Sequence, residues 1–364
     1  MEKTAGGFDL PYRSPGTATL ESIIVVLFTI LSILENTLII AAFFHLKSLR
    51  TIPNILVVNL SIVDVLSAIT THPLLASVLI QGAWCLGQEA CKYQAILNSF
   101  LFTTKNLSIT FITLNRYLII VRYKKYTNMF TKRSTRLFLV AIWISSCLLA
   151  LSPIMEQDEA TFHAKESLCV ISSKNSASSV VMVVFENIFF LATIYLNYAI
   201  LSLVRLHRKQ VFSFFDKKTS PSTSRVTPAS AALTSCRPYA IGTRGTIANR
   251  NEEPHIARKV FTVTTLYTIC WLPQGILKIA SLTNSKISRE IWMTSTFCMQ
   301  LSSVLNPILY GLLNRKLRKT IFGMFKIKAK MLIHVAATEV STRRLQMRSF
   351  KGAFTVSRVG AQAP

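Results

Sequence analysis

The chain has 364 residues, of which 51% are hydrophobic and 16% are charged, and its formal net charge is +25. This composition is too apolar for an ordinary soluble domain and indicates a membrane protein. A nucleic-acid-binding protein of this charge would need a soluble basic domain, which the sequence does not show, so we expect no nucleic-acid partner.

Seven apolar runs are long enough to cross a bilayer as helices, which takes about 20 residues each. They lie at about 23–44, 55–80, 95–121, 137–153, 180–204, 260–283 and 291–313. Buried helices of soluble proteins are usually shorter and are interrupted by more charge, which disfavours the soluble alternative. We therefore predict an all-α membrane protein, a bundle of seven transmembrane helices.

Basic residues in the connections predict the orientation, because Lys and Arg are retained on the cytoplasmic side. The connection 122–136 has six Lys or Arg and no acid, 205–259 has eleven against three acids, and 315–364 has twelve against one. The alternate connection 156–175 has four acids against two Lys. With seven spans, residues 1–20 are expected outside the cell in a multi-pass plasma-membrane protein, whose basic inner surface attracts anionic lipids.

The predicted transmembrane domain covers residues 21–313. Within it, 209–253 is rich in Ser, Thr and Pro and has no apolar period, which predicts a disordered cytoplasmic loop. After the last span, 314–325 places Leu317, Ile321 and Phe325 four residues apart between cations, as in an amphipathic helix on the membrane surface. The tail 326–364 is again predicted to be a disordered cytoplasmic segment.

Three cysteines, Cys85, Cys91 and Cys169, lie near the predicted outer face, where a disulfide can persist. One pair can form among the three, and periodicity does not choose between Cys85 and Cys91. No Cys and His spacing matches a metal site, so we expect neither a metal nor another cofactor.

The third apolar run contains two cations, Lys105 and Arg116. A helix turns about 100° per residue, so Cys91, Asn98, Lys105 and Arg116 fall on one stripe. A charge in lipid costs at least ~2.5 kcal/mol, so this stripe should face the bundle interior and find partners. Arg116 can alternatively extend to the inner headgroups, whereas Lys105 is too central for that.

Short motifs follow one another in register along these runs. They are ENTLI around Asn36, NLSIVD ending at Asp64, Trp84, Cys91, NRY at 115–117, Trp143, Cys169, CWLP at 270–273 and NPILY at 306–310. Over about residues 20–325 the chain therefore resembles a class A (rhodopsin-like) G protein-coupled receptor, and NRY is similar to the motif of melatonin receptors. The resemblance implies a receptor, not an enzyme, that passes an extracellular signal to a heterotrimeric G protein. It also implies arrestin and receptor kinases as partners.

The resemblance further assigns roles to individual residues. It implies an outer-loop disulfide between Cys91 and Cys169. The ligand-pocket positions are Asn98, Glu186, Trp271, Gln274, Lys278 and Gln300. The positions for G protein coupling and switching are Asn115, Arg116, Tyr117, Glu253, Pro273, Asn306, Pro307 and Tyr310. In the family, the carboxylate matching Asp64 helps to hold a sodium ion. Here we expect Lys105 to pair with Asp64 and to replace that ion, with Ser302 or Ser303 completing its hydrogen bonds. The alternative is that Lys105 points elsewhere, as a cation at the floor of the pocket.

The sequence also departs from the family pattern. Asn115 replaces the usual Asp before Arg116, while Glu253 stands where many members hold the acid that locks the sixth helix to the Arg. Asn98 replaces the Asp that binds biogenic amines, and Gln300 replaces the retinal-linking Lys of opsins. We therefore expect neither a monoamine receptor nor an opsin, and a peptide, a lipid or another small molecule as ligand.

Glu186 and Lys278 are expected either to contact a polar ligand or to serve a structural role, with Lys278 pairing or extending to the outer headgroups. Two alternatives to a ligand-activated receptor also stay open. One is an orphan or constitutively active seven-helix receptor without a diffusible agonist. The other is a membrane transporter, although the sequence shows none of the internal repeats that many transporters have.

Overall fold

The computed structural model describes residues 8–155, 159–172, 177–219, 253–282, 287–313 and 317–323. Its long helices correspond in order to the seven predicted spans. They are α1 (Pro15–His45), α2 (Ile52–Gln81), α3 (Gly87–Val121), α5 (Lys132–Met155), α6 (Ala177–Thr219), α7 (Glu253–Leu282) and α8 (Arg289–Leu313). A 3-10 turn, Lys47–Leu49, joins α1 to α2, and a short helix, α4 (Tyr123–Met129), joins α3 to α5.

Local chemistry sets several helix ends. Ser14 caps α1, because its Oγ accepts a hydrogen bond from the Thr17 backbone N–H at 3.2 Å, and Pro15 follows at the first helical position. Helix α2 stops at Gly82, whose φ of 77° lies in the left-handed region. The helices thus extend beyond the apolar runs, and α1 includes the last residues of the predicted outer segment 1–20.

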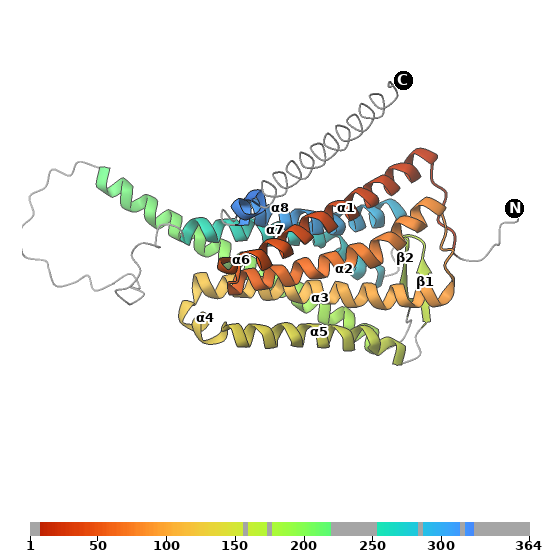
Figure 1. Ribbon diagram of the computed structural model, residues 1–364, viewed down its shortest axis with the longest axis horizontal. Coiled ribbons are helices and arrows are strands. Elements are labelled where there is room, and N and C mark those ends of the chain that lie inside the picture. The colour runs from red at the N-terminus through yellow and green to blue at the C-terminus, as the bar shows by residue number, and fades with distance from the viewer. Residues whose placement is uncertain are drawn as a thin grey trace, which may run out of the picture.

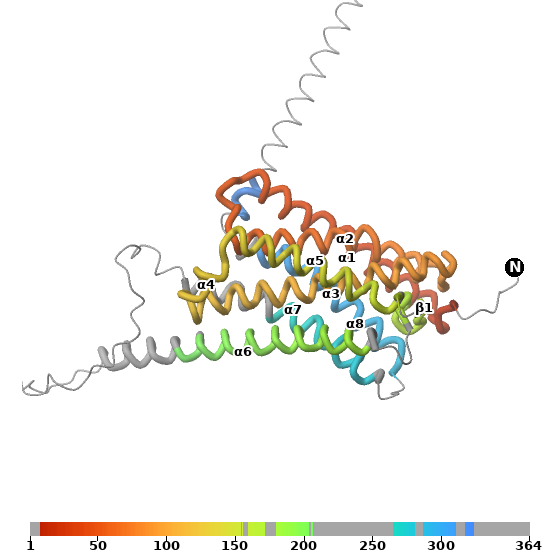
Figure 2. The backbone as a smooth tube through the Cα atoms, turned by 90° about the horizontal axis from the view of Figure 1, so that it is seen from below, coloured from red at the N-terminus to blue at the C-terminus, as the bar shows by residue number. Residues whose placement is uncertain are grey.

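The long helices lie side by side in one elongated bundle (Figure 1). Helix α3 runs through its middle (Figure 2) and contacts α2, α5, α6 and α7. Because α3 is surrounded, its interior stretch from Thr103 to Thr110 is buried throughout. Polar and charged side chains on α3 therefore lie where other helices, and not lipid, must supply their partners.

The described helices carry a clear membrane signal. Four of them contain segments long and apolar enough to cross a bilayer: Pro15–His45, Ile52–Gln81, Lys132–Pro153 and Val180–Leu203. Helix α3 includes more polar residues, which fits its position inside the bundle.

A two-stranded antiparallel hairpin lies in the connection 156–175, which the sequence analysis left without secondary structure. Strands β1 (Glu159–His163) and β2 (Leu168–Ser172) pair with Phe162 opposite Cys169. The hairpin lies at the end of the bundle opposite α4 (Figure 1). Residues 8–10 add a further strand-like contact there, since Leu10 N–H donates to Gly82 O at 2.8 Å and Trp84 N–H to Phe8 O at 3.0 Å.

The predicted loop 209–253 begins too early. Helix α6 continues to Thr219, because no Pro or Gly interrupts the chain between Ala177 and Thr219, and α7 already starts at Glu253. Residues 220–252 lie outside the described part, as do residues from 324 onward, which include the predicted tail 326–364.

A short helix, 317–323, follows α8, as the spacing of apolar residues predicted. Leu317 is buried and Ile321 partly buried against a cluster that includes Ile39, Val57 and Tyr310. Arg318 and Lys319 are exposed. Phe325, the third residue of the predicted apolar face, lies outside the described residues.

Candidate functional site

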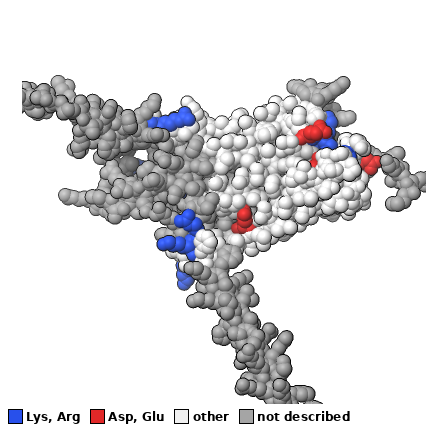
Figure 3. Space-filling model, turned by 90° about the horizontal axis from the view of Figure 1, so that it is seen from above, with Lys and Arg blue, Asp and Glu red and all other residues white. Residues whose placement is uncertain are grey.

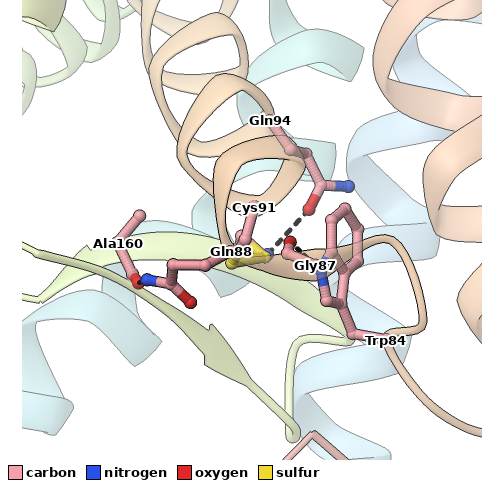
Figure 4. The surroundings of a disulfide bond; sticks show 7 residues. Trp84, Gly87, Gln88, Cys91, Gln94 and Ala160 are labelled. Carbon is pink, nitrogen blue, oxygen red and sulfur yellow. Dashed lines mark hydrogen bonds between the residues drawn. A yellow bond between two sulfur atoms is a disulfide. The ribbon is translucent and has the colours of Figure 1, made fainter.

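The end of the bundle that carries the hairpin is tied together by a disulfide between Cys91 and Cys169, whose Cα atoms are 5.3 Å apart (Figure 4). This is the pair that the resemblance implied, and Cys85 remains free and exposed. Around the bond, Gln94 Oε1 accepts from the Cys169 backbone N–H at 2.9 Å, and Gln88 donates to Ala160 O at 2.6 Å. The disulfide therefore fixes strand β2 to the first turns of α3.

Two neighbouring cavities lie beneath this hairpin. The first has a volume of about 70 Å³ and lies between α2, α3 and α8, with additional walls from Leu168 and Trp271. The second, of about 30 Å³, lies between α3, α6 and α7. The rings of Phe102 and Trp271 line both cavities and are 4.8 Å apart between centroids, so they form the wall between the two.

The six predicted pocket residues are all found in these cavity linings. Asn98 and Gln300 line the first cavity. Glu186, Gln274 and Lys278 line the second. Trp271 lines both, and its indole N–H donates to Ser302 Oγ at 3.0 Å. The structure therefore divides the predicted pocket into two compartments.

The second cavity contains an ion pair. The Glu186 side chain is 6% exposed, and its Oε2 lies 3.3 Å from Lys278 Nζ. Thr103 donates to the other carboxylate oxygen at 3.0 Å. Lys278 Nζ also lies 4.0 Å from the centroid of the Phe102 ring, which is within the range of cation–π attraction. Of the two expectations for these residues, the structure shows the pairing, with the pair also lining the cavity.

A second ion pair lies deeper, below the first cavity. Lys105 Nζ is 2.6 Å from Asp64 Oδ1, and Asp64 is completely buried. Lys105 also donates to Ser303 Oγ at 2.5 Å, whereas Ser302 instead accepts from Trp271 and donates to Met299 O. The structure thus brings together the two residues expected to form the internal pair, and Ser303 is the serine that joins them.

The predicted switch residues lie toward the α4 end of the bundle. Asn115 is fully buried, Arg116 is partly exposed, and Tyr117 packs against the central apolar cluster. Among the residues whose side chains are described, none is an acidic partner of Arg116. Glu253 is the first residue of α7, but its side chain lies outside the described part.

The remaining switch residues lie on α7 and α8. Pro273 lies inside α7 and Pro307 inside α8, where each removes one backbone hydrogen bond. Asn306 and Tyr310 are buried on α8. The switch roles of these four residues stay predictions.

Three residues with a clear place in the site were not singled out from the sequence: Phe102, His72 and Thr103. Phe102 follows Asn98 by four residues, so helical spacing places it on the same face of α3 and would have found it. His72 lines the first cavity from α2, and Thr103 supports Glu186. For these two, only the way the helices pack reveals the contact.

The comparison with known proteins settles the family. The sequence model of the family "7 transmembrane receptor (rhodopsin family)" matches residues 35–310. The chain belongs to this family. The match covers most of the chain and includes every element that lines the two cavities.

The relatives of this receptor carry the names of several different receptor types. It is 26% identical over 301 residues to melatonin receptor type 1B-B of Danio rerio, covering 81% of this chain and 78% of the relative. It is 24% identical to 5-hydroxytryptamine receptor 5B of Mus musculus, covering 89% of this chain and 90% of the relative. It is also 24% identical to melanopsin-A of Gadus morhua, covering 80% of this chain and half of the relative.

The crystal structure of squid rhodopsin has the same fold, with a TM-score of 0.67 at 17% identity. The match covers 88% of this chain and 91% of that one.

Proposed function

We propose that this receptor responds to a neutral or anionic extracellular ligand and activates a heterotrimeric G protein. The proposed ligand preference rests on one observation: the acid in the second cavity and the acid just below the first are each paired with a lysine. Glu186 is paired with Lys278, and Asp64 is paired with Lys105. A cationic ligand would therefore have to displace a lysine before it could reach a carboxylate in the described part of the site.

Relatedness alone does not exclude a monoamine or a retinal ligand, because a serotonin receptor and a melanopsin are among the relatives. The residues support the narrower proposal. Asn98, in the first cavity, offers an amide where amine receptors are expected to hold an acid, and Gln300 has no amine that could form an imine with an aldehyde. These two residues, together with the paired acids, favour a ligand without a positive charge.

The proposed direction of signalling has the hairpin end outside the cell and the α4 end inside. Figure 3 supports it: on the face shown, one end of the described surface carries Lys and Arg, and the other end carries most of the acids beside a few Lys or Arg. The broad surface between them is uncharged apart from an acidic patch near the basic end. Such a surface matches the hydrocarbon core, and the basic end matches the cytoplasmic side. The G protein would then contact Arg116 and the basic connection 122–136.

The test is a second-messenger and G protein dissociation assay on receptor at the cell surface, screened with peptide, lipid, indole and monoamine collections. We expect an uncharged or acidic compound to activate the wild type and to lose its effect on Arg116→Ala at equal surface expression. Activation by a monoamine would contradict the ligand class. Full activation of Arg116→Ala would contradict the coupling surface.

A further inference from the structure

The lining of the first cavity, between α2, α3 and α8, contains a positive charge and no negative one. Its residues are all described, and they include Lys105 but no Asp or Glu. The apolar part of the wall consists of Leu75, Leu101, Phe102, Leu168, Trp271 and Met299. The cavity is therefore an apolar chamber with an ammonium group at its base.

Two further side chains in this lining hold buried polar atoms without partners. His72 is 9% exposed and Gln300 is 6% exposed. His72 Nδ1 and Gln300 Oε1 have no hydrogen-bond partner within the described part of the chain. Buried polar groups are normally hydrogen-bonded, because leaving them unpaired costs free energy. An acceptor group of a ligand can pair with His72 Nδ1 when that nitrogen carries the proton, and with Gln300 when the amide is flipped so that its NH₂ takes the place of Oε1.

The ammonium of Lys105 contacts other side chains inside the helix bundle and also borders this cavity. It carries three N–H donors, of which the contacts with Asp64 and Ser303 account for two. Asp64 lies outside the cavity lining, whereas Lys105 is part of it and lies 5.7 Å from the Trp271 ring centroid. The third donor is thus available for an acceptor placed in the cavity.

We propose that this cavity binds the carboxylate of a small apolar acid, with one carboxylate oxygen accepting a hydrogen bond from Lys105 Nζ. A neutral His72 donates from Nδ1 to the same group, and the Gln300 amide, turned to present its NH₂, donates as well. The inference rests on the proposed function and names its ligand class. A charge-assisted bond is stronger than a neutral one, which favours the acid over its amide.

The effect of Asp64 on acid binding distinguishes a ligand-binding Lys105 from a Lys105 with a purely structural role. Its carboxylate lies 2.6 Å from the same ammonium, so it repels a ligand carboxylate and competes for the lysine. Neutralising it with Asp64→Asn should therefore tighten acid binding, on the order of tenfold or more. Removing both charges, with Lys105→Met and Asp64→Asn together, should abolish acid binding.

The experiment measures binding to purified receptor in nanodiscs, with no G protein present. The probes are acetate, hexanoate and phenylacetate, each compared with its own amide at constant ionic strength by saturation-transfer NMR. We expect at least one acid to bind at least about tenfold more tightly than its amide. Asp64→Asn should tighten that binding, while His72→Leu and Gln300→Leu, which leave the ion pair intact, should weaken it.

Glu35→Gln is the matched control, because it removes a carboxylate from α1, which contributes no residue to the cavity lining. It should not tighten acid binding. The proposal is overturned if none of the three acids binds wild type or Asp64→Asn, if acids and amides bind equally, or if His72→Leu and Gln300→Leu have no effect. A receptor that signals to other ligands but binds none of these acids would refute this inference alone. Acid binding without any G protein activation would refute only the proposed function.

Discussion

The ion pair between Lys105 and Asp64 should respond in opposite ways to the loss of one partner and the loss of both. Lys105→Met removes the ammonium while keeping most of the side-chain volume, and leaves Asp64, which is 0% exposed, without its cation. At a separation of 2.6 Å, the attraction between two unit charges is about 6 kcal/mol at an effective dielectric constant of about 20.

Much of that attraction offsets the cost of removing both charges from water. The net effect of breaking a buried pair is a loss of about 3–5 kcal/mol. The double variant, Lys105→Met with Asp64→Asn, buries no unpaired charge and should lie within about 1 kcal/mol of the wild type.

The assay is the thermal unfolding midpoint of purified receptor in one detergent, followed for wild type, Lys105→Met, Asp64→Asn and the double variant. At about 2–4 °C per kcal/mol, the single variants should unfold roughly 10 °C below the wild type, and the double variant within about 3 °C of it. Equal destabilisation of Lys105→Met and the double variant would refute the reasoning, because the charge imbalance would then not be the cause.

Three further predictions follow from the same contacts. Since the Lys105 ammonium lies against Asp64, exchanging sodium for N-methylglucamine at constant ionic strength should not shift the unfolding midpoint of the wild type. In Lys105→Ser, sodium should raise the unfolding midpoint. A sodium effect on the wild type would contradict the replacement of the sodium ion by Lys105. Glu253→Ala should raise basal signalling, because Asn115 provides no carboxylate for Arg116 and the resting state then depends more on Glu253. Unchanged basal signalling at equal expression would show that Glu253 does not hold Arg116 in the resting state. Burial raises the pKa of the Glu166 carboxyl, whose Oε1 lies 3.3 Å from His163 Nδ1 in the hairpin turn. Glu166 should therefore lower the stability of the receptor as pH rises through its folded pKa, and Glu166→Gln should remove that part of the pH dependence. An identical profile of unfolding midpoint against pH for the variant would disprove this role of Glu166.

The helices and the inner ion pair could be predicted because each depends on a local rule. Apolar length marks a span, and the turn of a helix places Lys105 on the interior stripe of α3. The cost of an unpaired charge in the membrane then requires a partner, and Asp64 is the acid that the family pattern places opposite. The hairpin was missed although Glu159–His163 alternates polar and apolar residues and Leu168–Ser172 is largely apolar, because each run is only five residues long.

The division of the pocket could not be predicted from the sequence. It depends on the Phe102 and Trp271 rings meeting at 4.8 Å, which is a result of how α3 and α7 pack. The same holds for His72, whose place in the first cavity depends on the rotation of α2 about its axis. Periodicity assigns residues to a face of one helix, but it does not say which face of a neighbour they meet.

The most direct test of the central claim is nucleotide exchange on purified G proteins, because it requires no knowledge of the agonist. Wild type, Glu253→Ala, Arg116→Ala and the combined variant, each in nanodiscs, are compared with empty nanodiscs on a panel of Gα subtypes. We predict that Glu253→Ala accelerates exchange on at least one subtype and that adding Arg116→Ala returns the rate to that of empty nanodiscs. Acceleration that persists without Arg116, or no acceleration on any subtype by any variant, would contradict the account.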